Sequence, residues 1–200
     1  HYLRQDLDQL LIPIHWMKNR QFFLERCLKS IEQQTYKNYE IIIIKQGKMA
    51  ETTNATIRGA KGDIIKFLYM DDLLAHQDAL QIIANNFKGG WLATGCLHTD
   101  RNSVFNPHFP AWDSQVKEGV NLIGSPSVVA IENRAPLLFD ENLSWALDCE
   151  LYKRLEKRFG KPKILTDVSV GIGIGDHQMT NILNNQQKLK ETNYLIEKYG

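Results

Sequence analysis

The chain has 200 residues, of which 43% are hydrophobic, and its formal net charge at pH 7 is +1. This size suits one domain with a hydrophobic core, and the near-neutral charge does not indicate nucleic acid or an anionic membrane as the main partner. The sequence contains no apolar run of about 18 residues, the minimum for a membrane-spanning helix, and no secretory signal pattern. We therefore expect a cytoplasmic protein, and peripheral attachment to a membrane stays open.

The three cysteines Cys27, Cys96 and Cys149 are widely separated in the sequence. An odd number at such spacing argues against a disulfide framework or a zinc site. We expect buried free thiols, as in a reducing compartment.

The first half of the chain alternates strand and helix. Strands are predicted at residues 10–16, 39–44 and 63–68, and helices at residues 21–34, 52–60 and 78–87. Four consecutive isoleucines, Ile41 to Ile44, indicate a strand buried on both faces, as in a parallel sheet. The alternation predicts an α/β fold with right-handed crossovers.

The second half is less regular. It predicts strands at residues 91–97, 127–131 and 168–174, a helix at residues 147–158, and a polar helical tail from His177 onward. Residues 100–113 are polar and contain proline, and are expected to form a long functional loop. Few apolar residues follow Asn184, which favours a peripheral or frayed helix at the end of the chain.

The run Lys66-Phe67-Leu68-Tyr69-Met70-Asp71-Asp72 joins a buried strand to two adjacent carboxylates. Ligands of open α/β sheets bind at the carboxyl ends of strands. Neighbouring like charges are unfavourable unless a cation compensates them, and a divalent metal that holds a diphosphate would do so. The alternative is a solvated turn in which an aspartate caps the next helix.

An ordered series of segments resembles one family. Residues 25–43 (ERCLKSIEQQTYKNYEIII) are similar to the opening helix and second strand of family 2 glycosyltransferases of the GT-A fold. Asn54, Lys61 with the following Gly62-Asp63, and Asp71-Asp72 continue the resemblance, which covers residues 10–155 and extends weakly to residue 180. It implies a mostly parallel central sheet flanked by helices. Residues 10–98 would bind the nucleotide-sugar, residues 99–182 would form the acceptor side, and residues 183–200 would be a peripheral helix.

The resemblance also implies an activity. Family 2 members transfer a sugar from a nucleotide diphosphate donor, here expected to be a UDP-sugar, to a hydroxyl of a glycan or another acceptor, with inversion. A divalent metal, Mn or Mg, neutralises the leaving diphosphate. Asp71 matches the metal-ligating second aspartate of the DxD motif, and His177 is in the place of a histidine that completes the metal shell or contacts the diphosphate. The alternative for His177 is a surface residue beside a helix start.

Three segments depart from the family pattern. Tyr69 stands where the first aspartate of the DxD motif is usual, and its hydroxyl could reach a ribose. Lys45-Gln46-Gly47-Lys48 replaces Asp-Asp-Gly-Ser, and Gln46 can donate to and accept from a uracil edge. Pro13-Ile14-His15-Trp16 replaces Pro-x-Tyr-Asn, so His15 or Trp16 could stack on the base, unless both are packing aromatics. The donor-binding residues implied are Pro13, His15, Trp16, Gln46, Asn54, Lys61, Tyr69 and Asp71.

The resemblance places the catalytic base at Asp148, which matches the second acid of a Glu-Asp pair, whereas Leu147 replaces the first. The base takes the proton of the acceptor hydroxyl. A carboxylate at a helix N-terminus is also favourable with the helix dipole alone, and the two roles are compatible. Glu150 is the second candidate for the base. On the acceptor side, Asp72 would orient the site or the acceptor, and Trp145 would stack on a sugar or belong to the core.

Two other functions remain open. The departures at Tyr69 and at Lys45-Gln46 would suit a degenerate member that binds a nucleotide-sugar without turnover. A sugar nucleotidyltransferase shares the α/β plan, but it carries a glycine-rich, arginine-containing phosphate loop after the first strand. Residues 14–17 (IHWM) do not resemble that loop.

Overall fold

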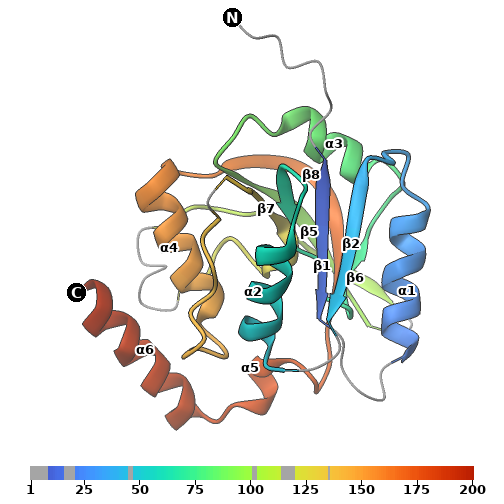
Figure 1. The fold of residues 1–200 in the computed structure, drawn as a ribbon. Helices are drawn as coiled ribbons and strands as arrows, with labels where there is room; N and C mark the ends of the chain where they lie inside the picture. The colour runs from blue at the N-terminus through green and yellow to red at the C-terminus, as the bar shows by residue number, and fades with distance from the viewer. Residues whose placement is uncertain (1–8, 16–20, 45–46, 101–102, 114–119, 135) are drawn as a thin grey trace, which may run out of the picture.

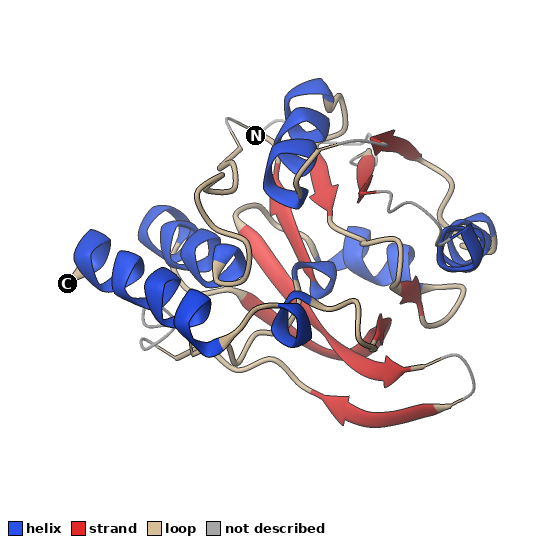
Figure 2. Cartoon of the chain, turned by 90° about the horizontal axis from the view of Figure 1, so that it is seen from below, coloured by secondary structure: helices blue, strands red, loops and turns tan. Residues whose placement is uncertain are grey.

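The computed structural model describes residues 9–15, 21–44, 47–100, 103–113, 120–134 and 136–200. Its strands form one eight-stranded sheet in the order β2-β1-β3-β7-β5-β8-β4, and β6 pairs with β5 outside this path. Helices flank the sheet (Figures 1 and 2). None of the described helices has the length and hydrophobicity needed to span a bilayer.

The first half of the chain forms the predicted parallel unit. Its elements are β1 (Leu10–His15), α1 (Gln21–Glu32), β2 (Tyr39–Ile44), α2 (Met49–Gly59) and β3 (Ile64–Lys66). Strand β1 pairs in parallel with both β2 and β3, as the alternation of strand and helix predicted. Helix α2 begins three residues before the predicted start, where the Glu51 carboxylate accepts the Lys48 backbone N–H at 3.3 Å.

The complete sheet is mixed, whereas the sequence indicated a mostly parallel one. The further elements are β4 (Leu73–Leu74), α3 (Ala79–Asn86), β5 (Trp91–Thr99), β6 (Val104–His108), the 3-10 turn η2 (Pro126–Val128), β7 (Val129–Glu132) and β8 (Lys163–Gly173). Strand β7 lies between β3 and β5 and is antiparallel to both, while β5 and β8 are parallel. Strand β6 forms a hairpin with β5 inside the segment that was expected to be a loop.

The isoleucine run does not lie in the sheet centre. Strand β2 is at one end of the sheet order and pairs with β1, and each of its residues is half-buried. The sequence predicted burial on both faces, and that prediction is wrong. The buried centre is formed instead by β1, β3 and β7, where Leu10, Ile65 and Ile131 have no exposed surface.

The C-terminal region contains α4 (Leu147–Phe159), α5 (Met179–Ile182) and α6 (Asn185–Tyr199). Helix α6 begins at a capping box in which Asn184 and Gln187 bond to each other's backbone N–H groups. It lies beside α4 in both views (Figures 1 and 2). The Glu191 carboxylate accepts the backbone N–H groups of Ser144, Trp145 and Ala146 at 2.9–3.0 Å. Helix α6 therefore caps the N-terminus of α4, which has no side-chain cap of its own.

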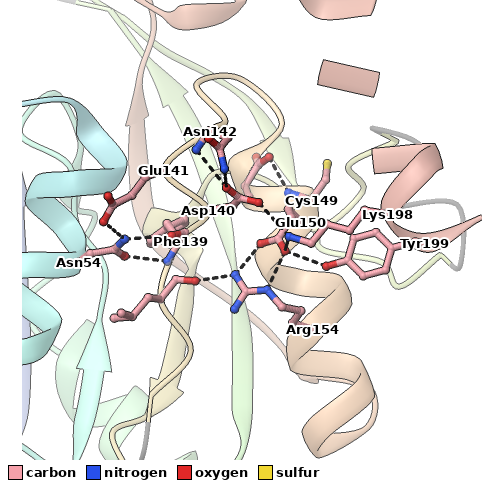
Figure 3. Close-up of polar contacts among 12 residues, drawn as sticks. Asn54, Phe139, Asp140, Glu141, Asn142, Cys149, Glu150, Arg154, Lys198 and Tyr199 are labelled. Carbon is pink, nitrogen blue, oxygen red and sulfur yellow. Dashed lines mark hydrogen bonds and ion pairs between the residues drawn. The ribbon is translucent and has the colours of Figure 1, made fainter. Parts of the chain in front are cut away.

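A cluster of polar side chains holds the C-terminal end of α6 against α4 (Figure 3). Lys198 bridges the carboxylates of Asp140 and Glu150, at 2.8 and 2.7 Å. Arg154 binds the same Glu150 from one turn further along α4. The chain end is consequently anchored to the helix that carries Asp148.

Candidate active site

A cavity of about 470 Å³ opens between the two halves of the chain. Its wall is made by residues 47–50, 69–72, 121, 125–126, 143–149, 172–173 and 177–180. The segment after β3, the N-terminus of α4 and the segment between β8 and α5 therefore meet at one place. Asp71, Asp72, Asp148, His177 and Trp145, which the sequence predicted as site residues, all line this cavity.

The two adjacent carboxylates after β3 point to different partners. Asp72 is buried, and its Oδ1 accepts the Gly173 backbone N–H at 2.7 Å. Burial and the neighbouring Asp71 charge raise the pKa of Asp72 well above its usual value, although hydrogen bonds to Ser127 and Gly173 partly oppose the shift. The Asp71 carboxylate instead lies 2.8 Å from His177 Nε2. Asp72 is thus a structural anchor between β8 and the site, and the half-buried Asp71 is the less buried member of the pair.

The segment that follows β8 brings His177 to Asp71. A Cβ atom at Gly173 would lie 2.2 Å from the Asp71 backbone oxygen, so the close approach of β8 requires glycine there. The His177 ring packs against Phe23 of α1, with ring centroids 5.2 Å apart. Arg26 of the same helix donates to the Asp71 backbone oxygen at 2.6 Å. Helix α1 therefore supports both members of the Asp71–His177 pair.

The donor set fits a divalent cation that shares its coordination with a ligand. One carboxylate oxygen and one imidazole nitrogen are groups that bind Mn, and carboxylate oxygen suits Mg. Within the described ranges, no further His, Cys, Asp or Glu joins them as a third ligand. Asp71 and His177 would leave coordination positions for diphosphate oxygens, which is the usual arrangement of a metal bound together with a nucleotide.

A lysine lies beneath the acidic pair. Lys66 is fully buried, and its ammonium group donates to the backbone oxygens of Phe67 and Ser127. Burial lowers the pKa of Lys66 to about 7, although the Asp72 charge opposes this. The Ser127 hydroxyl accepts the Tyr69 N–H at 2.9 Å. Sequence reasoning about function did not use Lys66, but a lysine inside a run of apolar strand residues is a visible signal.

Asp148 is in the first turn of α4 and is partly buried in the cavity wall. Its Oδ1 accepts the Cys149 N–H at 2.7 Å, and its Oδ2 accepts the side-chain amide of Asn121 at 2.6 Å. Burial raises the pKa of Asp148 to about 6, and these hydrogen bonds limit the rise. A carboxylate with this pKa can hold or release a proton near neutral pH.

Glu150 lies one half-turn away from Asp148 and does not line the cavity. Its side chain has no exposed surface and receives hydrogen bonds from three side chains (Figure 3). Arg154 donates at 2.5 and 2.7 Å, and Lys198 and Tyr199 each donate at 2.7 Å. Burial favours a raised pKa, but these bonds outweigh it and hold the pKa of Glu150 below its usual value. The contacts describe a structural anion that ties α4 to α6.

Of the other residues predicted to bind the donor, Tyr69 lines the cavity, whereas Asn54, Lys61 and Pro13 do not. Tyr69 lines the cavity, and its buried hydroxyl has no hydrogen-bond partner in the described part of the chain. Asn54 is buried outside the cavity wall, where it bonds to both backbone groups of Phe139 (Figure 3). Lys61 is exposed and Pro13 is buried in β1, and neither lines the cavity.

The residues predicted to contact the base are His15, Trp16 and Gln46. Trp16 and Gln46 lie outside the described residues, and His15 is described as the last residue of β1. On the acceptor side, the half-buried Trp145 ring lies 5.9 Å from Lys188 Nζ of α6. Asn121 was not recognised from the sequence, because an asparagine in an irregular segment carries no periodic or motif signal.

Comparison with known proteins adds to this geometry. The family profile described as "Glycosyl transferase family 2" matches residues 14–94. No match was found among curated proteins. The structure of S. aureus TarS 1-349 in complex with UDP-GlcNAc is similar over 94% of this chain and 65% of that chain, with 14% identity and a TM-score of 0.69. Another structure of TarS 1-349 is matched over 82% of this chain, with 13% identity and a TM-score of 0.63.

A second enzyme shares the fold. The mannosyltransferase PcManGT from Pyrobaculum calidifontis, in complex with GDP-Man and Mn2+, is similar over 86% of this chain and 59% of that chain, with 13% identity and a TM-score of 0.60. The chain spans 60% of the length of TarS 1-349 in the structure that matches 82% of this chain. Residues 14–94 therefore resemble glycosyl transferase family 2, and the described residues share the GT-A fold of these glycosyltransferases.

Proposed function

We propose that the chain transfers a sugar from a UDP-sugar to an acceptor hydroxyl, with inversion at the anomeric carbon. The observation that carries this proposal is the placement of Asp148 on the same cavity as the Asp71–His177 pair. A base for the acceptor and ligands for the diphosphate of the donor are both needed for such a transfer. The family match and the fold support this class of reaction.

Asp71 and His177 would hold Mn or Mg together with the diphosphate. A bound cation supplies charge neutralisation for the leaving diphosphate. Asp72 fixes the strand end through Gly173, and Arg26 holds the Asp71 backbone, so the Asp71 side chain keeps its direction. TarS is described in complex with UDP-GlcNAc, and PcManGT with GDP-Man and Mn2+. These descriptions support a nucleotide-sugar donor and a divalent metal for this chain.

Asp148 would act as the base. The acceptor oxygen forms a bond to the anomeric carbon, the bond from that carbon to the diphosphate oxygen breaks, and the diphosphate leaves with the electron pair. Asp148 takes the proton of the acceptor hydroxyl. Attack from the face opposite the diphosphate gives inversion. The pKa of about 6 keeps most of the Asp148 population ionised at pH 7 and still able to accept a proton.

The two sides of the cavity correspond to the two substrates. Residues 10–98 would supply the nucleotide side, where Tyr69 lines the cavity and would contact a ribose. Residues 99–182 would supply the acceptor side, where Trp145 lines the cavity and would stack on a glycan. The three buried free cysteines support a reducing, cytoplasmic location.

The test is release of UDP from a panel of UDP-sugars, with and without Mn, for the wild type, Asp71→Ala and Asp148→Asn. We expect metal-dependent release from one donor, and both variants should lose it. UDP binding without turnover of any donor would instead favour a degenerate member that binds nucleotide-sugars. Metal-dependent UDP binding that survives in Asp71→Ala would show that Asp71 is not a metal ligand.

A further inference from the structure

Asn121 connects an acceptor-side loop to Asp148. Its Nδ2 donates to Asp148 Oδ2 at 2.6 Å and to the Gly124 backbone oxygen at 3.0 Å. Its Oδ1 accepts the backbone N–H groups of Ile123 and Gly124, at 3.0 and 2.9 Å. Both donor hydrogens and both acceptor lone pairs of the amide are therefore used.

This pattern fixes the orientation of the amide. In a flipped amide, Oδ1 would face the Gly124 oxygen and the Asp148 carboxylate, and Nδ2 would face two N–H groups. Four mismatched contacts would replace four hydrogen bonds, so the flipped form is excluded by the network. Asn121 consequently presents an N–H donor to Asp148.

The loop that carries Asn121 is itself held in place by α4. The Tyr152 hydroxyl donates to the Gly124 oxygen at 3.0 Å, and Gly124 has a φ of 112°, which favours glycine. Helix α4 thus contacts the loop twice, through Tyr152 at Gly124 and through Asp148 at Asn121. The first contact braces the loop, and the second reaches the carboxylate that faces the cavity.

We infer that Asn121 is the positioning residue of Asp148: it fixes the rotamer of the carboxylate in the cavity and favours its ionised form. This inference rests on the proposed function, in which Asp148 is the base. The Cys149 N–H holds the other carboxylate oxygen, and the Cys149 thiol also bonds to this carboxyl, so Asn121 and Cys149 together determine where the carboxylate points. Asn121 lines the cavity but needs no contact with the donor to act in this way.

Asn121 and the Cys149 thiol are the side chains that form hydrogen bonds with the Asp148 carboxyl among the described residues. The Asn121 loop, residues 120–124, contains no ionisable side chain. The titratable and charged groups on the surrounding elements are Tyr69 after β3, Cys149 and Tyr152 on α4, and Lys48, Asp71, Asp72 and His177 on the cavity wall. Burial raises the pKa values of Tyr69, Tyr152 and Cys149, so these three groups are neutral near pH 7. They carry no positive charge that could stabilise the carboxylate.

The sharpest variant is Asn121→Asp. One carboxylate oxygen can still accept the Ile123 and Gly124 N–H groups, so the turn is retained. The other oxygen replaces the N–H donor and faces both Asp148 and the Gly124 backbone oxygen, so the bond to Gly124 is also lost. Asn121→Ala is the second variant, and it removes the donor without adding a charge. Tyr152→Phe is the structural control, because it loosens the same loop at Gly124 and leaves the Asn121–Asp148 contact intact.

A chemical control is also present in the chain. Asn142 donates its side-chain amide to Asp140 at 2.9 Å, outside the cavity. Asn142→Asp therefore makes the same change beside a carboxylate that has no proposed catalytic role. It should leave the pH dependence of transfer at the wild-type position.

Two measurements are made on each variant: the pH profile of kcat for transfer, and the titration of the Asp148 carboxyl carbon by NMR in aspartate-labelled protein. The Asp148 signal is assigned by its loss in Asp148→Asn. For Asn121→Asp, we expect the acid limb and the carboxyl titration to move up by about one pH unit or more, because a like charge replaces a donor. We expect kcat at pH 6.5 to fall roughly threefold or more, with less change in donor KM, and to recover as the pH rises.

The outcomes separate this inference from the proposed function. If the wild type transfers a sugar but Asn121→Asp and Asn121→Ala show the same pH profile and titration as Tyr152→Phe, the loop contact is merely structural and the inference is overturned. If the wild type transfers no sugar while the Asp148 titration still moves in Asn121→Asp, the positioning contact stands and the proposed function fails. An unmoved titration overturns the inference with or without activity.

Discussion

His177 Nε2 lies 2.8 Å from Asp71 Oδ2, although the two residues come from opposite halves of the chain. Both residues line the cavity wall. Their contact depends on Gly173, which lets β8 approach the Asp71 backbone. A carboxylate and an imidazole at this distance form either a structural ion pair or two ligands of one cation. The two possibilities differ in their dependence on metal, which makes His177 a useful position to change.

For His177→Ala, we expect the Mn-dependent part of donor affinity to fall by roughly tenfold or more, because one of two protein ligands is lost. Donor affinity measured without metal should change little. Titration calorimetry of UDP with and without Mn gives both values. His76→Ala is the matched control, because His76 forms a similar contact with Asp167 at 3.0 Å outside the cavity. An equal loss of metal dependence in both variants would contradict the assignment.

Transfer should depend on pH through Asp148. Burial raises the pKa of this carboxyl to about 6, and only the ionised form can accept the acceptor proton. The rate should therefore rise with pH through about 6 and level off above about 7. The measurement is kcat between pH 5 and 8 at saturating donor and metal. A rate that falls across this range as pH rises would rule out Asp148 as the base.

Tyr69→Phe should separate a donor contact from a packing role. The buried hydroxyl has no hydrogen-bond partner within the described structure, so its removal should leave the unfolding free energy unchanged or raise it by about 1 kcal/mol. If the hydroxyl binds the ribose, UDP affinity should fall roughly fivefold to tenfold. Tyr39→Phe is the control, because it removes a hydroxyl that bonds to the Ile31 oxygen. Unchanged UDP affinity in Tyr69→Phe would show that the hydroxyl does not contact the nucleotide.

Glu191→Gln should weaken the attachment of α6 to α4. The carboxylate accepts three backbone N–H groups at the start of α4, and its charge is favourable at that end of the helix dipole. We expect a loss of about 1–2 kcal/mol in the free energy of unfolding, measured in urea. Glu197→Gln, on an exposed position of the same helix, should change it by less than about 0.5 kcal/mol. Equal effects of the two changes would show that the capping contact does not contribute.

The sequence predicted the parts of the fold that follow from local pattern. The parallel unit β1–α1–β2–α2–β3 has the predicted order, because its strands and helices each carry a clear periodicity. The antiparallel insertion of β7 and the hairpin of β6 were not predicted, because strand order depends on contacts between distant segments. The half-burial of β2 has the same origin, since an isoleucine run is equally compatible with an edge and with the centre.

The candidate site was likewise predicted only in part from the sequence. Asp71, Asp148 and His177 were proposed from sequence, and the structure brings all three to one cavity. Lys66 and Asn121 were missed, because their partners are backbone or side-chain groups far away in the sequence. The distinction between Asp148 and Glu150 also required the structure. The two lie on the same helix turn, and only their surroundings distinguish an open carboxylate from one enclosed by Arg154 and Lys198.

The most direct test compares sugar transfer by Asp148→Asn and Glu150→Gln with the wild type, at saturating donor, metal and acceptor. Asp148→Asn should fold stably, because a carboxyl whose pKa is raised on folding destabilises the native state at pH 7. We predict that it binds the donor normally and loses transfer by about a hundredfold or more. Glu150→Gln should lose stability but keep transfer within about tenfold of the wild type. Transfer that survives in Asp148→Asn and is lost in a folded Glu150→Gln would contradict the account.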